Sequence, residues 1–235
     1  MKRFYETVAA EQVDGGYQIY LDGRPVRTPL KALLVAAQKS LAEAVVQEWN
    51  NQDGEMDLSS MPLTALLNVA VDHVAPRKAE VVAEIAAHVE MDLLCYRADT
   101  QEELHQLQEE RWQPILDWAN KSLSVRLSVT SGVLPISQPP EAVKSVVVTI
   151  EGMELLVLTG MLTLVPLFSS ALLGLAVSHG RVSAIGAYDL SVLEDVWQEQ
   201  KWGQDDEASQ RRASLREEAA AVGRLLALGG VFDKL

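Results

Sequence analysis

The most restrictive feature of the chain is an uncharged run from Leu155 to Val177, LLVLTGMLTLVPLFSSALLGLAV. Its 23 residues are enough to cross a bilayer as one helix. However, Pro166 removes a backbone donor and Ser169–Ser170 offers a helix cap, so a break near 166–170 would leave two segments too short to span. Neither flank carries the Lys/Arg cluster typical of a single-pass anchor. We expect two buried helices and no stable membrane insertion, with a membrane-anchored adaptor as the alternative.

Charge and cysteine content narrow the classes of function. The chain has 20 basic and 33 acidic side chains, and a net charge of −13 opposes binding to nucleic acid through a basic surface. With 48% hydrophobic residues, the composition is that of a folded chain. The one cysteine, Cys95, excludes an internal disulfide framework and suits a reducing compartment. The start, MKRFYE, has neither a secretory nor a transit signature. We expect the bacterial cytoplasm, or the mitochondrial matrix if a transit peptide has been removed.

The first part of the sequence predicts a small antiparallel sheet. Tyr17, Ile19 and Leu21 alternate with polar residues, which is the period of a half-buried strand. Asp22–Gly23 predicts a tight hairpin turn, because glycine reaches the positive φ of a primed turn. Phe4 to Val8 is expected to supply a further strand. Neither GxxxxGK[ST] nor GxGxxG is present, so no phosphate-binding loop is predicted.

From about Ala36 the hydrophobic period becomes helical, beginning with a stripe of Leu41, Val45 and Trp49. A helix is expected to begin at Ser59–Ser60 with Pro62, and the next to run from Pro76 to Met91–Leu94. Thr100 and Glu103 predict a capping box at the start of another helix, with a kink or restart at Pro114. Further helices are expected from Glu141, from Ser183 to Gln200 and from Asp205 to Leu228. Val125 to Pro140 is predicted as a linker. The fold class is therefore α+β, with a small β-rich N-terminal domain at 1–57 and a larger multihelical C-terminal domain at 58–235.

The sequence offers no catalytic constellation. Its four histidines are isolated, without an HExxH motif or an i, i+4 pair for zinc: His73, His88, His105 and His179. Cys95 lies in the apolar context DLLCYRA, which is typical of a buried small side chain rather than a nucleophile. No GxSxG elbow is present. We expect no enzyme, no cofactor and no metal, and a soluble enzyme of unknown type stays open as an alternative.

A junction near the C-terminal end of the sequence is more informative. Trp202–Gly203 should end one helix, because Gly203 suits the positive φ that follows a helix C-terminus. Asp205–Asp206–Glu207 should open the next helix, where the dipole stabilises carboxylates. Glu207 and Arg211 have the spacing of an i, i+4 ion pair. Trp202 suits either a helix-packing anchor or an interface, since tryptophan joins a large apolar body to a polar rim.

Several separated blocks resemble a known family in the same order: Lys2–Tyr5, GGYQIYLDGRPVRTP, Glu48–Trp49 with Gln52 and Gly54–Glu55, Met61–Thr64 with Asn68 and Asp72, Asp92–Ala98, Trp112 to Trp118, Gly132–Val133, and Glu194 to Gln198 with Trp202–Gly203, Asp205, Glu207 and Ala208. The family is that of the assembly chaperones for the α subunit of the F-type ATP synthase, the "ATP-twelve" type. The block Asp92–Ala98 is the most distinctive. Gln204 departs from the pattern, since a further acid is expected there.

The resemblance implies an ATP-independent chaperone, without cofactor or metal, that binds free α subunit until it meets β. It also implies a small sheet-bearing N-terminal domain and a helical C-terminal domain. Mapped onto this sequence, it places partner binding in the acidic C-terminal block, at Glu194, Asp195, Gln198, Trp202, Gly203, Asp205 and Glu207.

Overall fold

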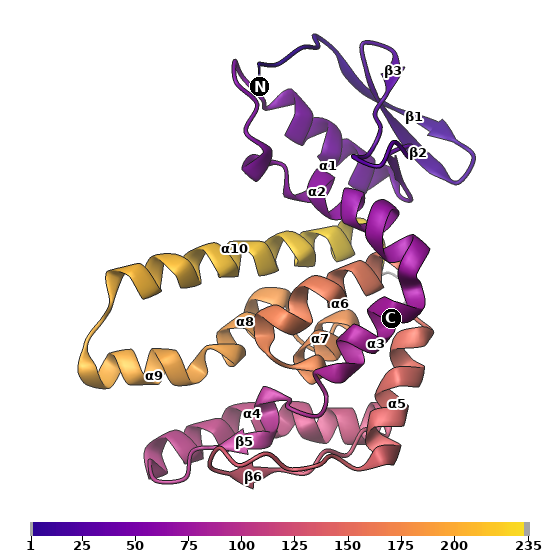
Figure 1. Ribbon diagram of the computed structural model, residues 1–235. Coiled ribbons are helices and arrows are strands. Elements are labelled where there is room, and N and C mark those ends of the chain that lie inside the picture. Colours follow the sequence, from indigo (N-terminus) through magenta and orange to yellow (C-terminus); the bar gives the residue numbers. More distant parts are fainter. Residues whose placement is uncertain (1, 233–235) are drawn as a thin grey trace.

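The computed structural model describes residues 2–232, and its first part is a small antiparallel sheet (Figure 1). The strands are β1 (Val8–Val13), β2 (Gly16–Leu21), β3 (Arg24–Pro25) and β4 (Val35–Ala36). β2 is central, because it pairs antiparallel with β1, β3 and β4. Helix α1 (Lys39–Asn50) packs on β1 and β2, and α2 (Pro62–Val69) packs on α1.

The turn between β2 and β3 confirms the predicted hairpin. Asp22 and Gly23 both have positive φ, 46° and 74°, as a primed two-residue turn requires. The predicted strand from Phe4 to Val8 is wrong, because β1 begins only at Val8. The reason is local: the Asp22 carboxylate accepts hydrogen bonds from the backbone N–H groups of Glu6 and Thr7. These residues are therefore tied to the turn rather than to a strand ladder.

A separate hydrophobic core lies between this sheet and its helices. The predicted stripe of α1 is confirmed, since Leu41, Val45 and Trp49 are all buried in it. Residues of α2 belong to the same core, and so does Leu225 from the last helix of the chain. The domain boundary at 57/58 stays a prediction, and the described core draws residues from both sides of it.

Two buried carboxylates hold this part together. Glu48, on α1, accepts hydrogen bonds from the backbone N–H groups of Leu63 and Thr64 at 2.7 and 2.8 Å. The residue before α2 makes no side-chain cap, so Glu48 provides the cap from another helix. Asp72 accepts from the hydroxyl of Thr28 at 2.6 Å. Each carboxylate thus joins segments that are distant in the sequence.

Beyond α2 the described chain is mainly helical. A 3₁₀ turn, η1 (Leu58–Ser60), precedes α2, and the elements that follow it are η2 (Ala70–Val74, a π-helical turn), η3 (Ala75–Arg77), α3 (Lys78–Ala87), η4 (Leu93–Cys95), β5 (Tyr96–Arg97), α4 (Glu102–Leu123), β6 (Thr130–Ser131), α5 (Pro140–Glu151), α6 (Leu155–Phe168), α7 (Ala171–Ser178), α8 (Ala184–Ser191), α9 (Leu193–Trp202) and α10 (Asp206–Leu228). Figure 1 shows α6 and α7 in the middle of this part, between α10 and α4.

The uncharged run folds into two helices, as predicted. α6 ends at Phe168, Ser169 takes a positive φ of 51°, and the Ser170 side chain caps α7. Every residue of α7 is buried. Pro166 lies within the last turn of α6, so the break falls just after it. Across residues 2–232, no helix combines the length and the apolar character needed to cross a membrane.

Asp92 joins these two helices to the segment before β5. Its buried carboxylate accepts hydrogen bonds from the N–H groups of Leu94 and Leu172, both at 3.0 Å, and from the hydroxyl of Ser170 at 2.8 Å. Burial raises the pKa of Asp92 to about 6, although these hydrogen bonds oppose the shift. One side chain therefore caps both η4 and the N-terminal region of α7.

The start of α4 differs from the prediction. The capping box of Thr100 and Glu103 is not formed, because α4 begins at Glu102 and its N-terminal neighbour makes no side-chain cap. The Gln108 side chain holds the preceding backbone instead, by accepting a hydrogen bond from the N–H of Ala98 at 2.7 Å. α4 then runs through Pro114 as one element.

The helices expected to end at 91–94 and to cover Ser183 to Gln200 are also corrected. α3 ends at Ala87, because Asp92 holds the chain in η4 a few residues later. The second helix is divided into α8 and α9. The indole N–H of Trp112, on α4, donates to the carbonyl of Leu190 at 3.0 Å. In an unbroken helix this carbonyl would accept from residue 194, so a tertiary contact replaces a helical one.

The stretch from Val125 to Pro140 is extended, as a linker would be, but it is packed. β6 pairs in parallel with β5, and the N–H of Gly132 donates to the carbonyl of Arg97 at 2.9 Å. The buried side chain of Gln138 bonds to both the N–H and the carbonyl of Ser128. These contacts fix the stretch against β5 and tie its two ends together.

Gly174 sets the close approach of α6 and α7 and gives a first test. A Cβ at this position would lie 2.6 Å from Val165 Cγ2 and 3.0 Å from Met161 Sδ. Gly174→Ala should therefore lower the free energy of unfolding by about 1–3 kcal/mol, as overpacking does. Gly152→Ala is the control, because its Cβ would meet only backbone carbonyls at 3.6 Å or more. Urea unfolding measures both, and equal effects would contradict the tight packing.

The raised pKa of Asp92 predicts a pH dependence of stability. The folded-state pKa of about 6 lies above the ordinary value of 3.8, so between these values only the native protein binds the proton. The stabilisation from this group is complete below pH 3.8 and is lost as the pH rises through about 6. Wild type should therefore gain stability over Asp92→Asn as the pH falls from 6 to 3.8, by up to about 1.4 kcal/mol per pH unit.

Asp22→Asn is a control of opposite sign for this titration. Hydrogen bonds from the backbone of Thr7 and Glu6 lower the pKa of Asp22. The stability difference between wild type and Asp22→Asn should therefore shrink as the pH falls through the ordinary aspartate range. Urea unfolding at a series of pH values measures both differences. A pH-independent difference for Asp92→Asn would contradict the shift caused by burial.

Candidate functional site

The helices α9 and α10 form a hairpin that holds the predicted contact residues. They run in opposite directions and are joined by residues 203–205, on the side of the molecule away from the N-terminal sheet (Figure 1). Gly203 has a φ of 102°, which confirms the positive φ predicted for the residue after Trp202. We call this unit, residues 193–228, the α9–α10 hairpin.

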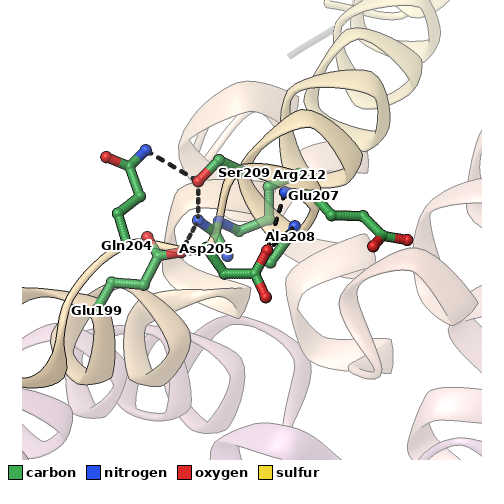
Figure 2. A network of polar contacts seen from close by, with 7 residues as sticks. All are labelled: Glu199, Gln204, Asp205, Glu207, Ala208, Ser209 and Arg212. Carbon is green, nitrogen blue, oxygen red and sulfur yellow. Dashed lines mark hydrogen bonds and ion pairs between the residues drawn. The ribbon is translucent and has the colours of Figure 1, made fainter.

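A network of polar contacts fixes the tip of the hairpin, where residues 203–205 join the two helices (Figure 2). Arg212 on α10 forms an ion pair with Glu199 on α9 and donates to the hydroxyl of Ser209 at 3.1 Å. The amide of Gln204 donates to the same hydroxyl at 2.9 Å. The two charged side chains are only 18% and 22% exposed, so water screens the pair less than it screens a surface pair. Hydrogen bonding to Glu199 raises the pKa of Arg212.

Asp205 caps α10, which confirms the predicted helix opening. Its Oδ1 accepts hydrogen bonds from the N–H groups of Glu207 and Ala208 at 2.9 and 3.2 Å (Figure 2). The predicted ion pair between Glu207 and Arg211 is wrong. Among the described residues, α10 forms its ion pairs with other helices, through Arg212 to Glu199 on α9 and through Arg216 to Asp189 on α8.

A groove of about 560 Å³ lies between the hairpin, α8 and the end of α6. Apolar and aromatic side chains form part of its lining, among them Leu167, Phe168, Tyr188, Val192 and Leu215. Charged side chains line it as well, and they come from both helices of the hairpin: Asp195, Asp205, Glu207, Arg211 and Arg212. The groove therefore offers apolar surface together with charges of both signs.

The structure divides the predicted contact residues among three places. Asp195, Asp205 and Glu207 line the groove. Glu194 instead lines a second hollow, beside β5 and the start of α4, and Gln198 donates to its carboxylate at 3.0 Å. This separation follows from the helix itself, because neighbouring residues point about 100° apart.

Trp202 and Gly203 occupy the third place, at the tip of the hairpin. The Trp202 side chain is 70% exposed, although it is a large apolar group. Its ring meets that of Trp197 edge to face, with 5.7 Å between the ring centroids. Lys201 lies between α9 and α4, since its ammonium pairs with Glu103. The exposure shows that Trp202 is not a buried packing anchor, and its role at an interface stays a prediction.

Sequence reasoning missed Tyr188 as a residue of the groove. The residue is 2% exposed, and no described residue forms a hydrogen bond with its hydroxyl. Burial raises the pKa of this phenol. Of the charged side chains in the groove lining, Arg212 lowers this pKa and Asp195 raises it. A tyrosine within the short sequence AIGAYDLS gives no periodic signal that could have marked it.

The residues considered for catalysis lie elsewhere. Cys95 is fully buried, and burial raises the pKa of its thiol far above the ordinary value. A buried neutral thiol is a packing group rather than a nucleophile, as predicted. Among residues 2–232, no three His, Cys, Asp or Glu side chains gather in a way that could hold a metal ion.

Comparison with known proteins shows the family to which the chain belongs. The model of the ATP12 chaperone protein family matches residues 2–120, about half of the chain. The chain belongs to the ATP12 chaperone family. This confirms the resemblance seen in the sequence blocks, and ATP12 chaperones serve the assembly of ATP synthase. Membership of a chaperone family also agrees with the expectation that the chain is not an enzyme.

Solved structures of relatives support the ATP12 fold. Atp12 from Paracoccus denitrificans is 36% identical, covers 97% of this chain and 98% of its own, and superposes with a TM-score of 0.93. The Atu1473 protein from Agrobacterium tumefaciens is also 36% identical, over 96% of this chain and 85% of its own, with a TM-score of 0.91. The predicted α+β class is thereby confirmed.

A further relative is the protein named "Protein atp12, mitochondrial" from Schizosaccharomyces pombe. It is 23% identical over 219 residues, which are 88% of this chain and 75% of that protein. The family-model match ends at residue 120, before the α9–α10 hairpin begins. The contact roles of the seven predicted residues therefore stay predictions.

The ion pair of Arg212 and Glu199 should determine how firmly the hairpin of this ATP12 chaperone is held. Glu199→Gln or Arg212→Gln should each weaken the link by about 1 kcal/mol and speed hydrogen exchange of backbone amides at 193–210. The exchanged pair, Glu199→Arg with Arg212→Glu, should recover much of the protection. A double-mutant cycle read by hydrogen exchange measures the coupling. A coupling of zero would show that the pair does not fix the hairpin.

Proposed function

We propose that the client of this ATP12 chaperone is the free α subunit of the F-type ATP synthase, and that the α9–α10 hairpin contacts it. The chaperone holds newly made α subunit until β covers the same surface in the catalytic head. Membership of a family that serves ATP synthase assembly supports a client of this kind. The contact residues are Glu194, Asp195, Gln198, Trp202, Gly203, Asp205 and Glu207.

The observation that carries the proposal is the exposed indole of Trp202, three residues before Asp205, which lines a groove of mixed apolar and charged side chains. A folded chain gains by burying a tryptophan, so a tip that leaves it 70% exposed is suited to burying it against a partner. The edge-to-face contact with Trp197 holds the ring in place. The side chain therefore loses little further freedom when a client covers it.

The charges of the groove suit a hold that can be reversed. Apolar anchors supply most of the affinity of such an interface, while charges at its rim steer the encounter and select the partner. Asp195, Asp205 and Glu207 stand in the walls, and Arg211 adds a cation that pairs with no described residue. Moderate affinity is required, because β must displace the chaperone.

In this proposal the chaperone retains the α subunit by non-covalent binding alone, without ATP, a cofactor, a metal or covalent chemistry. Burial of Cys95 supports it, since the one thiol of the chain is out of reach of a client. The compartment is the one in which α subunits assemble, either the bacterial cytoplasm or the mitochondrial matrix. Relatives from bacteria and from a mitochondrion support both settings.

Substitution at the hairpin tip tests the proposal. Trp202→Ala should weaken the complex with the cognate α subunit by roughly tenfold or more, because it removes an exposed apolar anchor. Wild type and variant are co-expressed with the α subunit in the absence of β, and the soluble α that co-purifies is measured. Val148→Ala is the matched control, since Val148 is also exposed but lies on α5. Failure of wild type to retain any α subunit would reject the proposed client.

Asp205 needs a pair of variants, because it also caps α10. Asp205→Asn keeps a capping side chain and removes the charge, whereas Asp205→Ala removes both. If the charge contacts the client, Asp205→Asn should already lower co-purification several-fold while thermal stability stays near that of wild type. If only Asp205→Ala has an effect, Asp205 acts through the cap and does not belong to the contact surface.

A further inference from the structure

Arg97, on β5, is a buried cation whose hydrogen-bonding capacity is mostly unused. Its side chain is 1% exposed and lies over the ring of Trp112, 5.3 Å from the centroid. Nη1 donates to the carbonyl of Leu94. Nε lies 3.5 Å from a carboxylate oxygen of Glu109 without forming a hydrogen bond, and no described residue accepts one from Nη2. A buried guanidinium with free N–H groups is unusual, because burial of unsatisfied donors is costly.

Arg97 lines the second hollow, which has a volume of about 500 Å³ and lies apart from the groove. Two carboxylates line it, Asp99 from the segment before α4 and Glu194 from the first turn of α9. Val133 and Leu134 line it too, and they are among the most exposed large apolar residues of the described chain, at 90% and 78%. Figure 1 shows β5 and β6 lying beside α4.

The apolar residues of the hollow are held in position by the backbone. β6 pairs with β5, and the N–H of Gly132 donates to the carbonyl of Arg97 itself. Gly132 has a φ of 87°, so the turn that presents Val133 relies on glycine. The backbone contacts of Gly132 therefore place the exposed apolar side chains of Val133 and Leu134 next to the buried guanidinium of Arg97.

We propose that this hollow is a second client-contact surface, which takes an extended segment with alternating apolar and basic side chains. The inference rests on the proposed function, since it assigns the segment to the same unassembled client. A main-chain carbonyl of the segment accepts hydrogen bonds from Arg97. Its apolar side chains cover Val133 and Leu134.

The charges of the hollow select basic rather than acidic segments. Asp99 and Glu194 would repel a carboxylate at the opening, and they would attract a lysine or arginine. A backbone carbonyl satisfies the free N–H groups of Arg97 without adding negative charge near Asp99. The chain as a whole carries −13, which favours the approach of a basic segment.

Overlapping twelve-residue peptides of the cognate α subunit test this surface by fluorescence anisotropy. Peptides with basic and apolar residues should bind wild type, and Val133→Ser with Leu134→Ser should weaken them at least tenfold. The control, Leu58→Ser with Val148→Ser, removes exposed apolar side chains elsewhere and should stay within twofold. Asp99→Lys should shift the selection towards acidic peptides. None of the five substituted positions belongs to the contact set of the α9–α10 hairpin.

A direct reading comes from the Nε–H signal of Arg97 in arginine-labelled protein, which should shift when such a peptide binds. Unchanged binding by the Val133/Leu134 variant, selection of acidic peptides by wild type, or an unmoved Arg97 signal would each overturn the second contact. Co-purification of intact α subunit with wild type separates the two proposals. If α is retained while the peptide results fail, only this inference falls, and if α is not retained, the proposed client falls with it.

Discussion

The fold depends on buried carboxylates that accept hydrogen bonds from distant segments of the chain. An ionised carboxylate is stable away from water only where several donors surround it, so each one forces the segments that supply those donors to meet. Asp92 brings η4 to the start of α7, Glu48 on α1 caps α2, and Asp72 holds the turn at Thr28. Hydrophobic burial provides the larger free energy, but it is not directional. These few polar contacts select one arrangement of the apolar helices among many compact ones.

Local patterns in the sequence were enough for the features that depend on neighbours in the chain. The Asp22–Gly23 turn, the stripe of α1, the cap at Ser170 and the cap at Asp205 all follow from residues a few positions apart. Features set by distant partners were missed. Trp112 takes the carbonyl of Leu190 and divides α8 from α9, and Gln108 replaces the capping box expected at Thr100. Glu48 reads as a surface acid of an amphipathic helix until α2 is placed against it.

The same limit applies to the candidate site. The helix end at Trp202–Gly203 and the acids at the start of α10 could be predicted from the helix junction. The exposure of Trp202, which the sequence left open, and the division of Glu194 from Asp195 required the surroundings of α9. Tyr188 and Arg97 could not be found from spacing, because their interest lies in hydrogen bonds that they do not make. In the two proposals, α9 stands between two contact surfaces, and its link to Arg212 keeps them at a constant distance from each other. A client that touches both would be held by a rigid element rather than by a flexible arm.

The position of Leu225 affects how the protein folds while it is being synthesised. It is fully buried in the core of the N-terminal sheet and α1, although it lies on α10, and Ser40 also donates to the carbonyl of Leu228. A ribosome releases the sheet long before it has synthesised these residues. The N-terminal core therefore leaves the ribosome without the apolar side chain that α10 contributes to it. The core residues that contact Leu225 stay exposed until α10 has been synthesised and packs against them. Contacts of such long sequence separation slow folding, so this helper of another protein's assembly itself passes through an interval of exposed hydrophobic surface.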